Sequence, residues 1–256
     1  MNNEKQKLSV LIITLNEEQH IKSLLEDIDF ADEIIVVDSY STDKTVSIVE
    51  SFKNVKLIQN RFVDYTSQRN FALDKAKNSW VLFIDADERL TPELKSEITA
   101  TINSENTASA YFIYRIFMFK NSRLNFSGWQ TDKIFRLFDK SKCRYNEERT
   151  VHEKLIVNGE IATLKNKLIH FSYSSYKDYK SKMYNYGILK ANEKFAKGIK
   201  PYFLLLLLHP VYTFLYQFII RFGFLDGKKG VIICYLNAYS VYIRYKELRR
   251  IISSRI

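Results

Sequence analysis

Two aspartates one residue apart, Asp85 and Asp87, follow five apolar residues in the stretch WVLFIDADERL. Carboxylates at this spacing on a loop can bind one Mg²⁺ or Mn²⁺ ion and leave other coordination positions for phosphate oxygens. A sugar diphosphate would suit such a site. The alternative is a solvated loop ahead of a helix that begins at Thr91 and Pro92, and Glu88 is expected to be solvated in either case.

The elements that must position these aspartates alternate along the first hundred residues. Continuous apolar runs, typical of a buried parallel sheet, predict strands at 8–14, 33–37, 55–58 and 80–84. Each strand is followed by a helix pattern, with Asn16 as the expected cap of the first helix and Ser41 or Thr42 as that of the second. The alternation predicts a doubly wound α/β sheet, which binds ligands beyond the carboxyl ends of its strands.

The sequence lacks the motifs of two other nucleotide-binding sites that are common on such sheets. The turn after the first strand, TLNEE, has no GxGxxG pattern, and the chain contains no GxxxxGK[ST]. Cys143 and Cys234 lie far apart and outside any Cys/His cluster, which suits a reducing compartment. The first apolar stretch is too short for an export signal, so we expect a cytoplasmic location.

The net charge of +10 is concentrated at one end of the chain. Residues 165–256 hold 17 of the 39 basic residues and only 4 of the 29 acidic ones. Twelve of the 17 tyrosines lie in the same part, among long apolar runs rather than in a solvated groove. This mixture favours an anionic lipid surface as the partner and argues against nucleic acid.

Several ordered motifs resemble family 2 glycosyltransferases, and among them the bacterial lipopolysaccharide core β-1,4-glucosyltransferases. The motifs are TLNEE (14–18), VVDSYSTDKT (36–45), QRNFALDKA (68–76), FIDADE (83–88), WQTDKIFRLF (129–138), RTVHEKL (149–155) and LIHFSYSSYKDY (168–179). The resemblance implies an α/β fold of the A-type (Rossmann-like), which binds nucleotide sugars. It covers roughly residues 7–180 and extends more loosely into the C-terminal tail.

The resemblance also implies roles for individual residues. A divalent ion, Mn²⁺ or Mg²⁺, would be held by Asp85, Asp87 and His170. The nucleotide-sugar donor would be bound by Thr14, Asn16, Glu17, Asp38 and Arg69. Residue chemistry leaves alternatives open: Asp38 could be a helix cap or Asx turn, Arg69 a surface ion pair, and His170 a structural histidine.

Inverting transfer needs a base that takes the proton of the acceptor hydroxyl. The resemblance implies Glu153 for this role, with Asp132 and Glu147 as competitors and a plain salt bridge as the alternative for Glu153. On the acceptor side, His152 would orient the acceptor or diphosphate and Trp129 would stack on a sugar, unless Trp129 is a core residue.

The predicted catalytic domain spans 1–175, with a nucleotide-sugar half at 1–100 and an acceptor and base half at 101–175. The predicted helical region, 176–256, contains 19 residues without a charge at 202–220. That length permits a membrane span or re-entrant hairpin, and a soluble helical core is a further alternative. His209-Pro210 and Gln217 interrupt the run, which favours helices lying in the membrane interface.

Together these features predict an inverting, metal-dependent hexosyltransferase. Its donor would be UDP-glucose and its acceptor a lipid-linked glycan such as the lipopolysaccharide or lipooligosaccharide core. The expected location is the cytoplasmic face of a bacterial inner membrane, bound peripherally or monotopically. The alternatives are transfer of N-acetylhexosamine to a polyprenyl-linked or capsular glycan, and an inactive membrane-associated binding protein with the same fold.

Overall fold

The computed structural model describes residues 5–120, 122–147, 154–173, 175–200 and 202–254. Strand and helix alternate four times in the first part of the chain, as the sequence predicts. These elements are β1 (Leu8–Thr14), α1 (Ile21–Asp27), β2 (Glu33–Asp38), α2 (Thr45–Glu50), β3 (Val55–Gln59), α3 (Tyr65–Lys75), β4 (Trp80–Phe83), β5 (Glu88–Arg89) and α4 (Pro92–Ile102).

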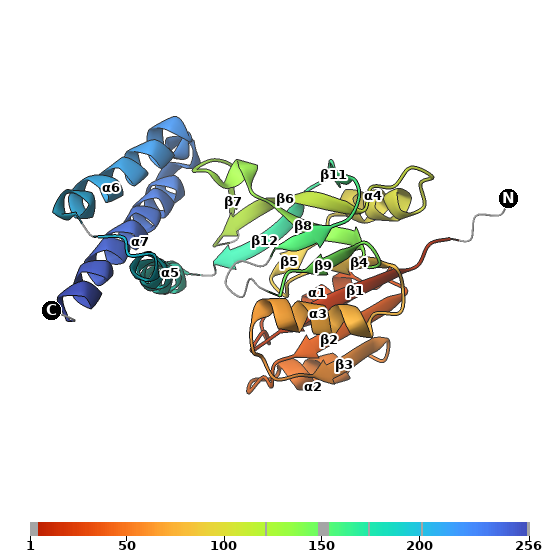
Figure 1. The fold of residues 1–256 in the computed structure, drawn as a ribbon. Coiled ribbons are helices and arrows are strands. Elements are labelled where there is room, and N and C mark those ends of the chain that lie inside the picture. The colour runs from red at the N-terminus through yellow and green to blue at the C-terminus, as the bar shows by residue number, and fades with distance from the viewer. Residues whose placement is uncertain (1–4, 121, 148–153, 174, 201, 255–256) are drawn as a thin grey trace. The chain divides into compact units, whose positions relative to one another are not determined.

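The first four strands form a parallel sheet in the order β3-β2-β1-β4 (Figure 1). Thr14 at the end of β1 lies opposite Asp38 at the end of β2, so the carboxyl ends meet at one edge. The sheet continues antiparallel through β8 (Lys133–Asp139) and β6 (Ala110–Phe119). The smaller strands are β7 (Ser122–Leu124), β9 (Cys143–Tyr145), β10 (Leu155–Val157), β11 (Ile161–Thr163) and β12 (Leu168–Tyr173).

Both faces of the central strands are covered, which explains why β1, β2 and β4 carry continuous apolar runs. Val10 and Ile12 of β1 pack in one core with α1 and α4. Leu11, between them in the sequence, points to the opposite core, which contains Leu73 of α3 and Tyr145 of β9. Alternate residues of a strand face opposite sides, so a strand buried on both sides must be apolar at every position.

The predicted caps of the first two helices are wrong, whereas that of α4 is confirmed. α1 begins after His20 and α2 after Lys44, neither with a side-chain cap. Asn16 instead has a left-handed backbone, φ 56°, and its side-chain oxygen accepts a hydrogen bond from the backbone N–H of Thr42 at 2.8 Å. Asn16 therefore joins two loops instead of capping a helix. Thr91 accepts a bond from Leu94 N and Pro92 opens α4, as expected.

The chain forms two compact units. One contains Met1–Arg115 and Lys133–His170, and the other contains Ile116–Asp132 and Phe171–Ile256. This division differs from the predicted boundary at residue 175, because residues 116–132 group with the C-terminal helices. The helical unit holds the helices α5 (Tyr176–Ala196), α6 (Phe203–Leu215) and α7 (Gly227–Ser253) and the short turns η1 (Trp129–Thr131), η2 (Tyr216–Ile220) and η3 (Gly223–Asp226).

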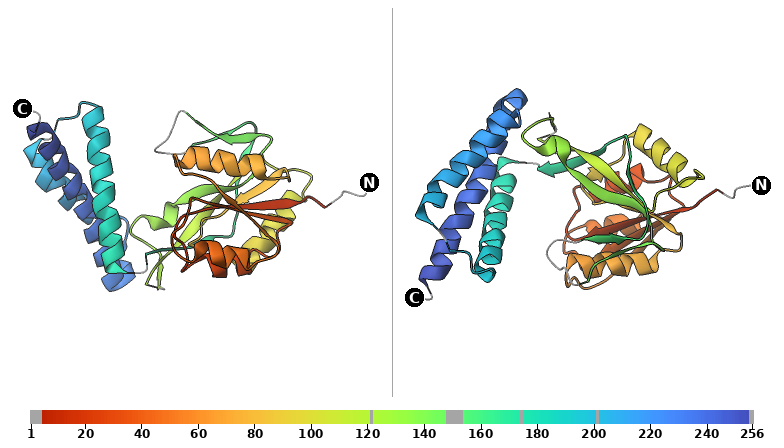
Figure 2. Two further views of the ribbon diagram at one scale, coloured as in Figure 1. Left: turned by 90° about the horizontal axis from the view of Figure 1, so that it is seen from below. Right: turned by 45° about the horizontal axis from the view of Figure 1, so that its top comes forward.

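Within the helical unit, α7 packs against both α5 and α6 (Figure 2). Its core includes Phe117, Phe119, Tyr179, Ile233 and Leu236. No residue of α6 is fully buried, although the helix is almost entirely apolar. Residues 203–220 form a helical stretch long and apolar enough to cross a membrane, which by itself is weak evidence of membrane contact. Contact of α6 with a membrane therefore stays a prediction.

Candidate active site

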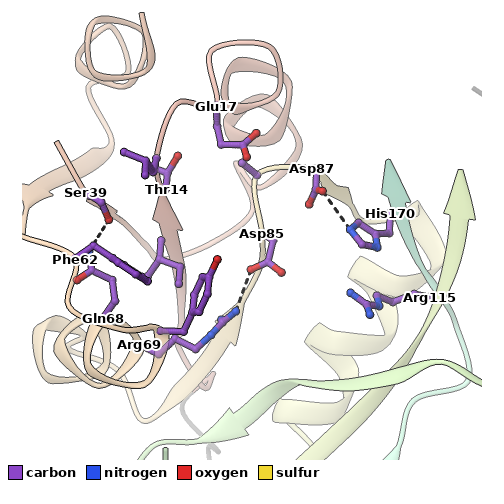
Figure 3. A pocket seen from close by; sticks show the side chains of 14 residues that line it. Thr14, Glu17, Ser39, Phe62, Gln68, Arg69, Asp85, Asp87, Arg115 and His170 are labelled. Carbon is purple, nitrogen blue, oxygen red and sulfur yellow. Dashed lines mark hydrogen bonds and ion pairs between the residues drawn. The ribbon is translucent and has the colours of Figure 1, made fainter. Parts of the chain in front are cut away.

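A cavity of about 400 Å³ opens at the carboxyl ends of β1 and β4 (Figure 3). Six residues predicted from the sequence line it: Thr14, Glu17, Arg69, Asp85, Asp87 and His170. The parallel sheet brings the first five to this edge, and β12 supplies the histidine. The fold therefore assembles in one place groups that are as far apart in the sequence as residues 14 and 170.

Asp85 lies between two guanidinium groups. Arg69 Nη2 is 3.2 Å from Asp85 Oδ1, and Arg136 on β8 contacts Asp85 Oδ2. Burial alone raises the pKa of Asp85, but the charges of Arg136 and Arg69 outweigh it and hold that pKa well below its usual range. Asp85 is therefore an anion whose oxygens face two arginines, and its part in holding a metal, directly or through water, stays a prediction.

Glu88 is fully buried, so the expectation that it is solvated is wrong. Its carboxylate accepts hydrogen bonds from Arg136 Nη2 at 2.7 Å and from the backbone N–H of Asp85 at 3.0 Å. Burial raises the pKa of Glu88, and the nearby Asp85 carboxylate raises it further. The positive charge of Arg136 lowers the pKa, but not enough to reverse the rise. Glu88 holds the loop between Asp85 and Asp87 in its conformation through both of these contacts.

Asp87 meets His170 across the cavity. Asp87 Oδ2 and His170 Nε2 are 3.1 Å apart, and both side chains keep some exposed surface (Figure 3). Strand pairing sets this distance, because His170 lies opposite Glu88 where β12 runs antiparallel to β5. The two side chains consequently point into the same part of the cavity.

The Asp87 and His170 pair fits a divalent ion in part. Two adjacent ligands of an octahedral ion, each about 2.1 Å from the metal, are roughly 3 Å apart, which is the spacing of these two atoms. Among the residues that the structure describes, no group of three or more His, Cys, Asp and Glu side chains is arranged to bind a metal. Such a site would therefore supply two protein ligands and leave the rest to water and phosphate oxygens.

The opposite wall of the cavity is polar at its base and aromatic at its rim. Arg69 lies over the ring of Phe83, 5.1 Å from its centroid, which fixes the guanidinium group. Gln68 donates a hydrogen bond to Ser39 Oγ at 3.0 Å. Phe62 and Tyr65 line the same wall and form an edge-to-face pair with centroids 5.0 Å apart. This wall offers hydrogen-bonding groups beside flat apolar surfaces.

Thr14 adds a hydroxyl to the base of the cavity. Its Oγ1 atom is buried and has no hydrogen-bond partner among the described residues. An unpaired buried hydroxyl is costly, by about 1–3 kcal/mol. A ligand or water in the cavity could supply the missing bond.

Asp38 and Asn16 do not line the cavity. Asp38 has no exposed surface, and its carboxylate accepts bonds from the backbone N–H and the hydroxyl of Ser41. This is the turn that the alternative interpretation of Asp38 expected. In this conformation Asp38 and Asn16 shape the two loops at the edge of the sheet, and direct contact with a donor stays a prediction for both.

Of the acceptor-side and base predictions, none that the structure describes is among the residues that line this cavity. His152 and Glu153 fall outside the described residues. Trp129 and Asp132 belong to the helical unit, where Trp129 packs on Phe117 with ring centroids 4.0 Å apart. Glu147, a competitor for the base, is mostly exposed and accepts a hydrogen bond from Asn70 Nδ2 at 3.3 Å. The choice of base therefore stays a prediction.

Sequence reasoning missed Arg136 and Arg115. Arg136 is 1% exposed and bridges Asp85 and Glu88, and Arg115 lines the cavity 3.7 Å from Glu88 Oε1. A signal was available for Arg136, because it is the only charge within the apolar strand segment IFRLF. A charge in a buried strand needs a buried partner of opposite sign.

Comparisons with known proteins identify the family of this chain. The family model described as Glycosyl transferase family 2 matches residues 9–158. A glycosyltransferase of Rickettsia bellii is 32% identical over 256 residues, which cover 96% of this chain and 87% of that protein. The lipopolysaccharide core biosynthesis glycosyltransferase LpsC of Rhizobium meliloti is 27% identical, with 94% of each chain covered.

Among solved structures, TarS of S. aureus has the same fold. Its TM-score is 0.50 at 22% identity, over 95% of this chain and 50% of that one. The α/β fold implied by the sequence motifs is thus confirmed. Since the family match spans more than half of the chain and its relatives align along nearly all of it, this protein is an enzyme of glycosyl transferase family 2.

Proposed function

We propose that this enzyme transfers a hexose, glucose from UDP-glucose, to a lipid-linked glycan such as the lipopolysaccharide core, with inversion at the sugar carbon. The observation that carries the proposal is the cavity in which Asp87 and His170 face a wall that contains Arg69 and Thr14. Its acidic and histidine side suits a divalent ion, and its cationic and hydroxyl side suits a diphosphate.

The donor would lie across this cavity. Arg69 is held by Asp85 and by the ring of Phe83, so its guanidinium group is already oriented for diphosphate oxygens. Arg115, on the other side, adds a second positive charge. The aromatic pair Phe62 and Tyr65 offers a flat surface for the uracil ring, and Glu17 and Thr14 offer polar contacts beside it.

Asp87 and His170 would hold a divalent ion, Mn²⁺ or Mg²⁺. Such an ion, when bound, neutralises negative charge on the diphosphate as it leaves. Asp85 and Glu88 act through the protein: Asp85 fixes Arg69, and Glu88 fixes the loop that carries Asp87.

The reaction would be a direct displacement. A base, for which Glu153 is the first candidate and Asp132 and Glu147 follow, takes the proton of the acceptor hydroxyl. The hydroxyl oxygen bonds to the sugar carbon from the face opposite the diphosphate. The bond from that carbon to UDP breaks, and UDP keeps the electron pair.

The acceptor and the location are proposed from the helical unit and from one relative. α6 exposes one apolar face, made of Leu204, Leu207, Leu208, Val211 and Leu215. A face of this kind can lie in the membrane interface and bring the enzyme to a lipid-linked sugar at the cytoplasmic leaflet of the inner membrane. The relative LpsC is named for lipopolysaccharide core biosynthesis.

The decisive experiment measures UDP release from a panel of UDP-sugars with a lipid-linked acceptor extract. We expect UDP-glucose to be the best donor, and we expect Asp87→Asn to lower turnover at least about 100-fold by weakening charge stabilisation. The control Glu26→Gln removes an exposed acid on α1 and should leave turnover unchanged. Full activity after treatment with a chelator would refute the proposed dependence on a divalent ion. A higher rate with UDP-N-acetylhexosamine would refute UDP-glucose as the donor.

A further inference from the structure

A second cavity, of about 570 Å³, lies entirely within the helical unit. Its walls come from α5, α6, η2 and α7, which pack side by side (Figure 2), and from η1. The lining residues are Trp129, Met183, Tyr186, His209, Thr213, Gln217, Asn237, Ser240, Val241 and Arg244. This mixture of polar and aromatic groups is unusual for a cavity between apolar helices.

Three of the residues that line this cavity each carry a buried polar atom without a partner among the described residues. The atoms are Trp129 Nε1, Ser240 Oγ and Arg244 Nε. Ser240 is 2% exposed, so its hydroxyl has no access to bulk water. Each unpaired buried group costs about 1–3 kcal/mol, and an occupant of the cavity that reached these three atoms would recover that cost.

Neighbouring polar groups in the same walls are already paired. Asn237 Nδ2 donates to Gln217 Oε1 at 2.9 Å, and His209 Nδ1 lies 2.9 Å from the hydroxyl of Tyr245. The polar groups of these walls are therefore partly paired with one another and partly left without a partner among the described residues.

The chemistry of the three atoms defines the occupant. The indole N–H and the guanidinium N–H can only donate, and the serine hydroxyl can donate as well. Arg244 forms no ion pair with any residue that the structure describes. Three donors, one of them cationic and without a partner, fit an anion with several acceptor oxygens, and a phosphate group has this form.

The surroundings of the cavity favour a phosphate that belongs to a lipid. His209 and Thr213 of α6 line the cavity, whereas Leu208, Val211 and Tyr212, their neighbours in the sequence, are exposed on the same helix. A headgroup in the cavity would therefore leave its acyl chains beside apolar side chains that are exposed to solvent. A free phosphate ion would gain nothing from that face.

We propose that this cavity binds the phosphate headgroup of a membrane lipid, with Arg244, Trp129 and Ser240 as hydrogen-bond donors. The inference rests on the proposed membrane contact of α6 and is independent of sugar transfer. It assigns to the helical unit a specific lipid site, in addition to a general affinity for an apolar or anionic surface.

Trp129 itself can report binding. The chain has two tryptophans, and Trp80 lies in the core of the other unit. In the full chain with Trp80→Phe, the emission of Trp129 is recorded during titration with dihexanoyl phosphatidic acid, dihexanoyl phosphatidylcholine or inorganic phosphate. We expect a saturable change with phosphatidic acid, weaker binding of phosphatidylcholine and little binding of inorganic phosphate.

Two variants test the donors. Arg244→Gln should weaken binding of phosphatidic acid about 10-fold to 100-fold, because a charge-assisted hydrogen bond is lost. The control Lys246→Gln removes the same charge from an exposed position of the same helix and should bind as the parent does. Ser240→Ala removes only a hydroxyl and tests the site if Arg244→Gln fails to fold.

Each other outcome overturns a defined part of the proposal. Equal affinity for phosphatidylcholine would refute recognition of the anionic headgroup, and equal affinity for inorganic phosphate would identify a site for a free ion. If neither Arg244→Gln nor Ser240→Ala changes binding, the assignment of these two residues as hydrogen-bond donors is wrong. Vesicle flotation and UDP release, measured on the same variants, separate a failure of this site from a failure of membrane contact or of transfer.

Discussion

Arg136 and Glu88 form an ion pair in the interior of the unit that contains the candidate active site (Met1–Arg115 and Lys133–His170), here called the catalytic unit. The distance between Nη2 and Oε1 is 2.7 Å, and neither side chain has more than 1% of its surface exposed. The same guanidinium group contacts Asp85, whose other oxygen faces Arg69. The loop that carries Asp87 therefore lies between two carboxylates, Asp85 and Glu88, that share one guanidinium group. The network stabilises this wall of the cavity, because loss of Arg136 would deprive the buried Glu88 of its nearest cation.

Arg136→Met should destabilise the protein strongly. The substitution leaves Glu88 and Asp85 without their shared cation, and removing one partner of a buried pair costs about 3–5 kcal/mol. Urea unfolding, followed by circular dichroism, measures the change. The matched control is Arg144→Met, which breaks a half-exposed pair with Asp74 and should cost no more than about 1 kcal/mol. Equal losses for the two variants would contradict the role assigned to Arg136.

Cys143 should resist alkylation in the folded protein. Burial raises the pKa of its thiol to about 12, and the nearby Asp139 carboxylate adds to the rise, so little thiolate exists at pH 8. Iodoacetamide labelling followed by mass spectrometry should find Cys143 modified only after unfolding in urea. Rapid labelling in the native state would show that the thiol is accessible and ionised.

The same shift has a consequence for stability at high pH. The folded pKa lies above the unfolded value of 9.0, so the stabilising contribution is complete below pH 9 and is lost as the pH rises towards 12. Across this window the free energy of unfolding of the parent should fall more steeply with pH than that of Cys143→Ala. If the free energies of unfolding of the two proteins change in parallel with pH, the pKa of Cys143 is not raised in the folded state.

The sheet and part of the site could be predicted from the sequence, because short local residue patterns indicate them. Strands buried on both faces are continuously apolar, so β1, β2 and β4 could be located from their composition, and acids at the carboxyl ends of β2 and β4 had to share one edge. The caps were mispredicted because Asn16 bonds to Thr42, 26 residues away, which a local pattern does not reveal.

Long-range pairing also explains the remaining differences. Glu88 looks like one more loop acid in ADERL, and only its contact with Arg136, 48 residues later, makes it a buried group. His170 is different, because the motif in which it lies resembles a family pattern. Its approach to Asp87 depends on the pairing of β12 with β5, which involves residues more than 80 positions apart.

His170→Gln should weaken binding of Mn²⁺ in the presence of UDP by about tenfold or more, because one of two proposed protein ligands is lost. Isothermal titration calorimetry with Mn²⁺ measures this without relying on catalysis. The control His209→Gln changes a histidine of the helical unit and should leave Mn²⁺ affinity unchanged. If both variants bind Mn²⁺ as the parent does, His170 is a structural residue, as the alternative interpretation of the sequence allowed.

Leu204→Gln with Leu208→Gln should reduce flotation of the protein on vesicles that contain anionic lipid. Both side chains are more than half exposed on one face of α6, and burying a leucine in an apolar phase contributes about 1.5–3 kcal/mol. Loss of two should lower the partition coefficient at least about tenfold. The control pair Ile156→Gln and Ile161→Gln changes exposed apolar residues of the catalytic unit by the same chemistry and should float as the parent does. Because neither leucine is buried in the protein, the urea midpoint should stay the same. A variant that floats normally would place the membrane contact elsewhere than on α6.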